Sequence, residues 1–350
     1  MRSSLLVVLA VTVIGCRTPS NAGDDGGGDD TPKVDAKLPP DGPIDAPAGN
    51  GCEPTSPRGG TVEAFIGPTG LQDRLVQLIN GAQTSLDLQI YVFTVYALRD
   101  AIIAAKNRGV AVRVLFDPNH PGNADTRTSF NTAGVPNRNA PLIYDYSHAK
   151  YMIIDHKSAV VMSMNFDVGS MQTARNYGMV DRDAADIADV QAVFDQDWAA
   201  GGGDPPKPAD LACTRMIVSP VNSKSRIVSF IESAHTTLDV EAFYVTETDT
   251  RAAIIAAKQR GVAVRVILEA SGDPTETKNL FTAQGIPVHL SSGFFLHAKL
   301  IVADGVAFVG SENYSYTSLT RNREMGALVF EASQAATIKQ QFNTDWANTN

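Results

Sequence analysis

The chain has 350 residues, of which 43% are hydrophobic, and it carries a formal net charge of −9. This length and composition are typical of a globular protein with one large domain or two ordinary ones. Residues 17–53 hold −5 of the charge and Arg2 adds +1, which leaves −5 for residues 54–350. The folded part is therefore mildly acidic, which argues against a protein that binds nucleic acid mainly through a broad basic surface.

Residues 1–16 predict a signal peptide. The apolar run from Leu5 to Ile14 follows a single basic residue and is too short to span a bilayer. It leads into the letters VIGC, which resemble the bacterial lipobox, where the cysteine, here Cys16, is lipidated and becomes the mature N-terminus. We therefore expect an extracytoplasmic protein, lipid-anchored in the bacterial outer membrane or secreted. The alternative is an ordinary signal peptide with a chance cysteine.

Residues 17–57 are rich in Gly, Pro and Asp and poor in large apolar side chains. Such a segment cannot offset its ordering entropy by burial, so we expect a disordered tether. Two further cysteines, Cys52 and Cys213, each stand just before the opening strand of one half of the chain. An extracytoplasmic compartment would permit a disulfide between them, although sequence alone does not show that they are close.

The remainder of the chain is an internal duplication. The segments that start at Thr84 and Ala101 recur at Thr236 and Ala253, both 152 residues later. We divide the chain into a first repeat, residues 58–205, and a second repeat, residues 206–350. The resulting protein is expected to be a monomer that contains its own pseudo-dimer.

Each repeat predicts the order strand, helix, strand, helix, strand, then an irregular stretch, a hairpin and a closing helix. In the first repeat, residues 71–82 and 97–109 have helical periodicity and end near glycine, and residues 110–117 are β-branched and strand-like. Alternation of helix and strand indicates an α/β fold, in which helices cover both faces of a sheet.

The hairpin of each repeat carries a histidine and a lysine at alternate positions. In the first repeat these are His148 and Lys150, and Asp155 follows them at the expected turn. Residues two apart on a strand share a face, so the imidazole and the ammonium group should lie together. The second repeat has the same pattern at His297, Lys299 and Asp304.

A serine and an asparagine, also two apart, follow each turn: Ser163 and Asn165, and Ser311 and Asn313. If His148 lies opposite Asn165, a two-residue loop closes the first hairpin, and the same pairing gives the second a three-residue loop. Each hairpin would then present His, Lys, Ser and Asn as a polar patch that suits a phosphate oxyanion. The alternative is a solvated strand face, which is the usual explanation of a lone histidine beside a lysine. Duplication alone would explain the recurrence, but many neighbouring residues differ between the repeats while this set is unchanged. For Asp155 and Asp304, a turn-fixing role is at least as good an interpretation as direct catalysis.

The segments HAKYMIID and HAKLIVAD both fit the pattern HxKxxxxD, and GSEN follows the second. Over about residues 60–348 the chain resembles the phospholipase D superfamily in its form with two motifs. The resemblance implies a duplicated α/β fold of two mixed sheets flanked by helices and related by a pseudo-twofold axis. It also implies one phosphodiester site, without metal or cofactor, where the motifs meet. In this family one histidine attacks phosphorus, the other protonates the leaving alcohol and then activates water, and the lysines and asparagines hold the phosphoryl oxygens.

The two repeats differ beside the motifs. The second contains Glu324, a carboxylate that could orient a histidine through its ring N–H, whereas the first reads as two residues shorter and lacks it. We expect Glu324 to serve one histidine and a first-repeat aspartate, Asp181 or Asp167, to serve the other; the alternative is an asymmetric site. The first repeat also has Met162 where the second has a glycine.

The leading hypothesis is a phospholipase D-type phosphodiesterase that acts on phospholipid headgroups at a membrane surface. Enzyme alternatives are a nuclease, in which case nucleic acid would be the partner, and a phosphatidyltransferase. A catalytically inactive binding module is the least favoured, because the His–Lys pairs are intact in both repeats.

Overall fold

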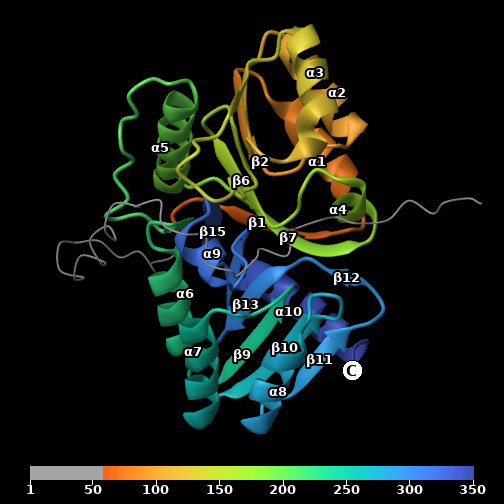
Figure 1. Ribbon diagram of the computed structural model, residues 1–350, viewed down its shortest axis with the longest axis vertical. Coiled ribbons are helices and arrows are strands. Elements are labelled where there is room, and N and C mark those ends of the chain that lie inside the picture. Colours follow the sequence, from red (N-terminus) through yellow and green to blue (C-terminus); the bar gives the residue numbers. More distant parts are fainter. Residues whose placement is uncertain (1–57) are drawn as a thin grey trace, which may run out of the picture.

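Each half of the chain builds one mixed sheet with helices on its outer face (Figure 1). The computed structural model describes residues 58–350. The predicted signal peptide and tether, with Cys16 and Cys52, lie outside these residues. Cys213 is disulfide-bonded, and its pairing with Cys52 stays a prediction. Among the described residues no helix is long and apolar enough to cross a membrane.

The first sheet has the order β1-β7-β6-β5-β2-β3-β4. Only β2, β3 and β4 run parallel to one another, and the other neighbours are antiparallel. The strands are β1 (Val62–Gly67), β2 (Ser85–Ile90), β3 (Ala111–Phe116), β4 (Asn137–Asn139), β5 (Tyr151–Ile154), β6 (Ser158–Met162) and β7 (Ala174–Asp181). The helices of this half are α1 (Leu71–Gly81), α2 (Tyr96–Asn107), α3 (Ala124–Ala133), α4 (Val168–Gln172) and α5 (Ala184–Gly201), with a 3₁₀ turn, η1 (Pro121–Asn123).

The second sheet repeats this topology in the order β8-β15-β14-β13-β9-β10-β11, again with three parallel strands at one side. Its strands are β8 (Met216–Ser219), β9 (Thr237–Ala242), β10 (Ala263–Glu269), β11 (Val288–Ser291), β13 (Lys299–Ala303), β14 (Val306–Gly310) and β15 (Glu324–Val329). A short strand, β12 (Phe295–Leu296), pairs instead with β7 of the first half. The helices are α6 (Ser223–Glu232), α7 (Thr248–Gln259), α8 (Thr275–Ala283), α9 (Tyr316–Thr320) and α10 (Ala332–Ala347).

The α/β class and the duplicated pair of mixed sheets are as expected from the sequence. The stretch expected to be irregular after β3 instead holds α3 and β4, and the segment between the hairpin and the closing helix forms α4 and β7. Buried side chains explain the additional helix, because Thr126 and Phe130 stand four residues apart on one face of α3.

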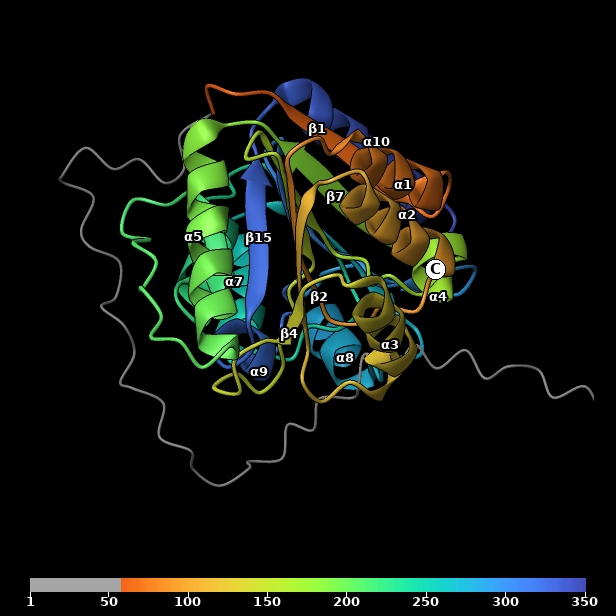
Figure 2. The same ribbon diagram turned by 90° about the horizontal axis from the view of Figure 1, so that it is seen from above.

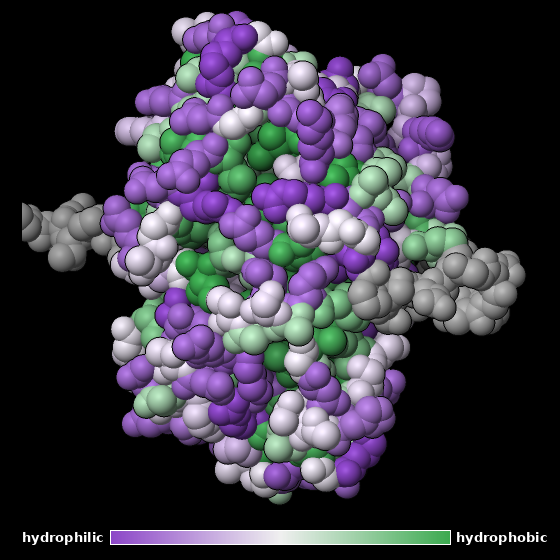
Figure 3. Space-filling model, turned by 180° about the vertical axis from the view of Figure 1, so that it is seen from behind, coloured by the Kyte–Doolittle hydropathy of each residue, from purple (hydrophilic) through white to green (hydrophobic). Residues whose placement is uncertain are grey.

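Both faces of each sheet are buried, as the alternation along β5 shows. Met152 and Ile154 pack in the core beneath α1 and α2, whereas Tyr151 and Ile153 point into a central core shared by the two sheets. Helices α5 and α10 close this central core (Figure 2). The second half has its own outer core beneath α6 and α7. On the face in Figure 3, hydrophilic side chains dominate the periphery of both halves and hydrophobic residues show mainly in the recesses.

The two hairpins differ from the expected register by one residue. Ile154 pairs with Ser158, so the first loop has three residues, and Ala303 pairs with Val306, so the second loop has two. The second loop is Asp304-Gly305, and both of its residues have positive φ angles, 47° and 89°. This conformation is the type I′ turn that the Asp-Gly pair favours, and it fixes the register of the second hairpin.

Candidate active site

His148 is held by the second repeat although it belongs to the first. Its backbone N–H donates to the carbonyl oxygen of Arg323 at 2.9 Å. Its ring Nδ1 lies 2.9 Å from Oε2 and 3.0 Å from Oε1 of Glu324. The imidazole is buried, and its backbone and side chain are both fixed from across the junction of the two sheets.

Glu324 is itself positioned by three donors. Ser311 and Ser318 donate their hydroxyl hydrogens to it at 2.6 and 2.7 Å, and the Asn322 amide donates at 3.0 Å. Burial alone would raise the pKa of this carboxyl group, but the charge and hydrogen bond of His148, with the charge of Lys150 and the Ser311 hydroxyl, outweigh burial and lower it. Glu324 is therefore ionised and stabilises a positive charge on His148.

His297 is held in the same way by the first repeat, but by an amide. Its Nδ1 lies 2.8 Å from Oδ1 of Asn176, and its backbone N–H donates to the Arg175 carbonyl at 3.1 Å. Ser163 donates to the same Asn176 oxygen at 2.9 Å. Because an amide oxygen only accepts, Nδ1 carries the hydrogen, and Nε2 faces the Lys299 ammonium group at 2.9 Å.

The expected aspartate partner for His297 was therefore wrong. Asp181 pairs with Arg58 at 2.8 Å, and Asp167 caps α4 by accepting from the Ser170 amide at 2.8 Å. The expected two-residue shortening was also wrong. Met162 pairs with Gly178 as Gly310 pairs with Gly326, so the repeats align here without a gap. In this alignment Asn176 occupies the position in the first repeat that Glu324 occupies in the second.

The two serines orient the histidine partners, Ser163 on Asn176 and Ser311 on Glu324, rather than joining a strand-face patch. The other four predicted side chains are nearly fully buried: Lys150, Lys299, Asn165 and Asn313. Burying two ammonium groups is costly unless anionic or polar groups compensate for lost hydration. Lys299 donates to the His297 carbonyl oxygen at 2.7 Å, and the charge of Lys150 acts on ionised Glu324.

Sequence reasoning missed Tyr91, which contacts both members of the first pair. Its ring centroid lies 4.7 Å from that of His148 and 5.2 Å from the Lys150 ammonium nitrogen. The His120 ring also packs against Tyr91, with ring centroids 4.9 Å apart. The available sequence signal was that Tyr91 aligns with Phe243 in the second repeat, so that an aromatic residue recurs at this position.

Asp155 and Asp304 fix turns, as the alternative interpretation held. The Asp155 carboxylate accepts backbone N–H groups of Gln83 and Thr84 at 3.0 and 2.6 Å, and Asp304 accepts from Thr236 at 3.0 Å. Burial is the largest single influence and raises the pKa of Asp155, but the backbone hydrogen bonds from Ser85, Thr84 and Gln83 together outweigh it and lower this pKa to about 2.

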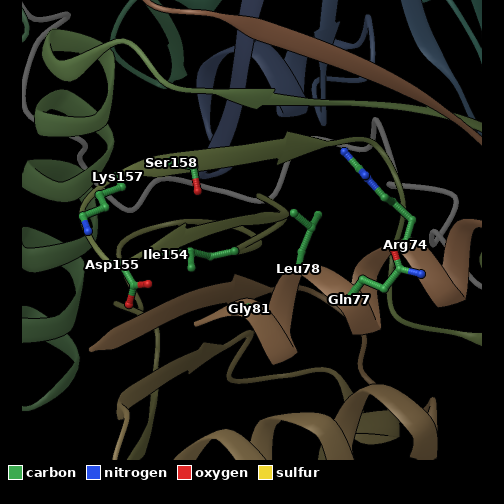
Figure 4. A pocket seen from close by; sticks show the side chains of 8 residues that line it. All are labelled: Arg74, Gln77, Leu78, Gly81, Ile154, Asp155, Lys157 and Ser158. Carbon is green, nitrogen blue, oxygen red and sulfur yellow. The ribbon is translucent and has the colours of Figure 1, made fainter. Parts of the chain in front are cut away.

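A surface hollow of about 350 Å³ adjoins this turn, with Asp155 and Lys157 on one side and Arg74 of α1 on the other (Figure 4). Lys150 stands five residues before Asp155, or roughly 16 Å along an extended strand. The hollow is therefore separate from the histidine site.

Two ion pairs beneath the site were also missed. Arg323 binds Asp197 of α5 through two hydrogen bonds, both 2.8 Å, and Arg175 binds Asp345 of α10 at 2.7 and 3.1 Å. Each pair joins one repeat to the closing helix of the other. The repeated segments FDQDW and FNTDW carry these aspartates, and their recurrence was the available signal.

Glu312 explains why the second repeat has a glycine where the first has Met162. A Cβ atom on Gly310 would lie 2.3 Å from the Glu312 carboxyl oxygen, and one on Gly326 would lie 2.7 Å from it. Glu312 is fully buried and accepts from Ser223 at 3.3 Å. Burial, aided by the charge of Glu324, raises its pKa well above the ordinary value, so this carboxyl group is held neutral.

The arrangement fixes two imidazoles from across the junction of the sheets and buries the lysine and asparagine of each hairpin. Such a set can supply a nucleophile, a proton donor and cationic charge to one phosphodiester. A single repeat would lack the residue that orients its histidine, because that residue comes from the other repeat.

Comparison with known proteins agrees with this geometry. The model of the family described as "Cardiolipin synthase, PLD-like domain" matches residues 75–198 and 227–346. A mitochondrial cardiolipin hydrolase of Xenopus tropicalis is 29% identical over 126 residues, which are 36% of this chain and 60% of the relative. A cardiolipin synthase of Clostridium perfringens is 22% identical over 340 residues, which cover 81% of this chain and 70% of the relative.

Solved structures share the fold. The phosphatidylserine synthase of Haemophilus influenzae superposes with a TM-score of 0.66 at 13% identity, covering 83% of this chain and 86% of the other. A polyphosphate kinase of Porphyromonas gingivalis superposes with a TM-score of 0.65 at 16% identity, covering 81% of this chain and 46% of the other. Since the family model matches well over half of the residues, the chain belongs to the phospholipase D superfamily, whose members act on phosphodiesters.

Proposed function

We propose that the protein is a metal-independent phosphodiesterase of phospholipase D type that hydrolyses the headgroup phosphodiester of phospholipids. The observation that carries this proposal is the cross-repeat pair of histidines, each with Nδ1 held by a partner and each accompanied by a buried lysine. Family membership supports phosphodiester chemistry. The relatives named for cardiolipin hydrolysis and synthesis favour a lipid substrate.

His148 is the proposed nucleophile. Its Nε2 would attack phosphorus, the bond from phosphorus to the headgroup oxygen would break, and the imidazole would carry positive charge in the phosphohistidine. Ionised Glu324, 2.9 Å from Nδ1, stabilises this charge as it develops. A carboxylate is of most use to the histidine that gains charge during the first step.

His297 is the proposed acid and then base. It would protonate the departing headgroup oxygen and, once neutral, would take a proton from the water that cleaves the phosphohistidine. A histidine with this role must release its proton readily. Asn176 and the adjacent Lys299 suit this role, because an amide oxygen stabilises the imidazolium form less than a carboxylate does and a neighbouring ammonium group opposes it.

The lysines and asparagines would hold the non-bridging oxygens. Lys150 and Asn165 approach from the first repeat, and Lys299 and Asn313 from the second. Their donors would strengthen contact as negative charge moves onto these oxygens in the transition state.

The membrane partner and the location follow from the N-terminal sequence. We propose that Cys16 is acylated and that residues 17–57 let the domain reach lipids of the same membrane. One acyl chain binds a bilayer only marginally, so firm retention would require the additional chains of a bacterial lipoprotein.

The test compares purified wild-type protein and His148→Ala on mixed phospholipid vesicles and on plasmid DNA, both with EDTA. We expect headgroup release from vesicles by the wild type alone, and no nicking of the plasmid. Nicking that depends on His148, without lipid hydrolysis, would instead establish the nuclease alternative. Exchange of the headgroup for an added alcohol without net hydrolysis would establish a transferase.

A trapping experiment separates the two histidines. With substrate labelled on the retained phosphatidyl group and carrying a good leaving group, His297→Ala should still form some acid-labile phosphoenzyme, and His148→Ala should form none. Label on His148→Ala but not on His297→Ala would reverse the assignment.

A further inference from the structure

The large apolar side chains that remain exposed are confined to one end of the sheets. Gln89 of β2 pairs with Tyr151 of β5, and Ala242 of β9 pairs with Lys299 of β13. The carboxyl ends of β2 and β9 therefore lie beside Lys150 and Lys299. We call this end of the two sheets the site end, because the histidines, lysines and asparagines are all found there.

Six large hydrophobic residues are prominently exposed among residues 58–350, and each stands in a connection at the site end. They follow β2, β4, β6, β8 and β14, and are Tyr96, Leu142, Ile143, Val168, Val221 and Tyr316. The opposite end, where the hairpins turn, exposes polar residues such as Arg108, His156 and Lys157. Apolar exposure on a single face marks an interaction surface rather than random scatter.

The most exposed pair is presented by an ordered segment. Leu142 is 78% exposed and Ile143 is 65% exposed, between β4 and His148. The next residue, Tyr144, is buried and stacks on the Arg323 guanidinium at 4.3 Å. The Asp145 N–H donates to the Arg321 carbonyl at 3.2 Å. Because these contacts tie down the segment on the His148 side, the two aliphatic side chains are held outward.

The fold does not require apolar residues at this position. In the second repeat the corresponding connection runs from Ser291 to His297, and its exposed tip residues are Ser292 and Gly293. The same sheet topology is thus completed there without an exposed aliphatic side chain, although the partly buried Phe294 and Phe295 follow the tip. The aliphatic tip belongs to the first repeat alone, five residues before His148.

We propose that the site end is an interfacial docking face that sits on a phospholipid bilayer, with Leu142 and Ile143 inserted among the acyl chains. Tyr96 and Tyr316 would lie at headgroup depth, where tyrosine places its ring and hydroxyl favourably. This inference rests on the proposed function, since a phosphodiester site surrounded by such residues meets its substrate in the membrane. Docking would bring headgroups to the histidines without extraction of a whole lipid into water.

The test uses the full chain with Cys16→Ser as a common background, so that acylation cannot hold any variant on the membrane. Leu142→Ser/Ile143→Ser removes the aliphatic tip, and Leu142→Ile/Ile143→Leu is the matched control that keeps it apolar. Each is assayed on vesicles of palmitoyl-oleoyl phosphatidylethanolamine and phosphatidylglycerol. A second assay uses bis(p-nitrophenyl) phosphate, a monomeric phosphodiester that needs no interface.

We expect the serine variant to lose vesicle binding in flotation and vesicle hydrolysis by at least about tenfold, since two aliphatic side chains no longer enter the bilayer. Its rate on the monomeric diester should equal that of the wild type, and the control variant should match the wild type in both assays. Unchanged vesicle binding, or an equal loss on both substrates, would overturn the docking face.

Two further outcomes separate this inference from its alternatives. A wild-type dimer in sedimentation velocity that the serine variant dissolves would assign the face to a second copy of the chain and overturn the membrane assignment. Vesicle binding that depends on Leu142 and Ile143, without lipid hydrolysis, would uphold the docking face while removing the proposed reaction.

Discussion

Replacing Asp197 with asparagine should destabilise the protein and disturb the site at once. Asp197 and Arg323 are both almost fully buried, with side chains 1% and 2% exposed, and they share two charge-assisted hydrogen bonds. Removing one partner of such a pair leaves an uncompensated buried charge, which costs about 3–5 kcal/mol. The Arg323 carbonyl also accepts the His148 N–H, so any shift of Arg323 moves the proposed nucleophile.

The pseudo-symmetric pair supplies the comparison. The Arg175 side chain is 16% exposed, and its partner Asp345 also faces Glu241. Burial, then the charge of Asp345, raises the pKa of Glu241 well above its usual range. Arg175 keeps part of its hydration, so it loses less than Arg323 when its carboxylate is removed. We therefore expect Asp345→Asn to cost about 1–2 kcal/mol, between the ranges for buried and exposed pairs.

Urea unfolding with linear extrapolation measures both costs, and phosphodiesterase rates below the transition measure the effect on the site. Asp197→Asn should lower kcat more than Asp345→Asn does. A cost below about 1 kcal/mol for Asp197→Asn would refute this reasoning, because a buried arginine without its carboxylate could not be so well tolerated. Equal costs for the two variants would refute the argument from exposure.

Three further predictions follow from the site. Activity should survive EDTA because Lys150 and Lys299 supply the cationic charge, and loss on chelation with recovery on adding Mg²⁺ or Zn²⁺ would contradict this. Glu312→Gln should become increasingly stable relative to the wild type as pH rises above the ordinary glutamate pKa. The folded-state pKa of Glu312 is raised, so its neutral form gives stability that is present below the unfolded value and is lost, at up to about 1.4 kcal/mol per pH unit, as pH rises toward the folded value. Glutamine loses nothing over this range. Parallel pH dependences in urea unfolding would show that Glu312 is not held neutral. Asn176→Asp should move the acidic limb of the pH profile of kcat upward by about one pH unit. A carboxylate at Nδ1 of His297 stabilises the imidazolium form, whereas the step that activates water needs the neutral form. An acidic limb that does not move would count against His297 as the base.

The residues of the two motifs were predictable from sequence because they recur at matching places in a duplication. The Asp-Gly turn was also recognisable, but its loop length was misjudged, since both hairpins were aligned by the facing polar residues and not by turn geometry. Helix α3 was missed because its sequence is polar apart from one buried stripe. Each error lies in a segment whose structure is decided by burial against distant elements.

The partner of His297 could not be found from sequence because the search was for a carboxylate. Matching Arg175-Asn176 of the first repeat with Arg321-Asn322 of the second introduced a two-residue gap into the sequence alignment. The strand registers of the two sheets show no such gap. The strand register shows that there is no gap and that Asn176 is the first-repeat equivalent of Glu324. The position was inferable only once β7 and β15 were known to pair with β6 and β14 at the same register.

Each repeat supplies the residue that orients the histidine of the other repeat, and this determines how sequence changes between the repeats affect the site. Asn176 belongs to the first repeat, yet it orients His297 of the second, and Glu324 of the second repeat orients His148 of the first. A substitution in one repeat therefore changes the chemistry of the histidine in the other. Two histidines that began as copies can acquire different roles without any change in the motifs themselves, because the carboxylate and the amide that distinguish them reside on the opposite sheet.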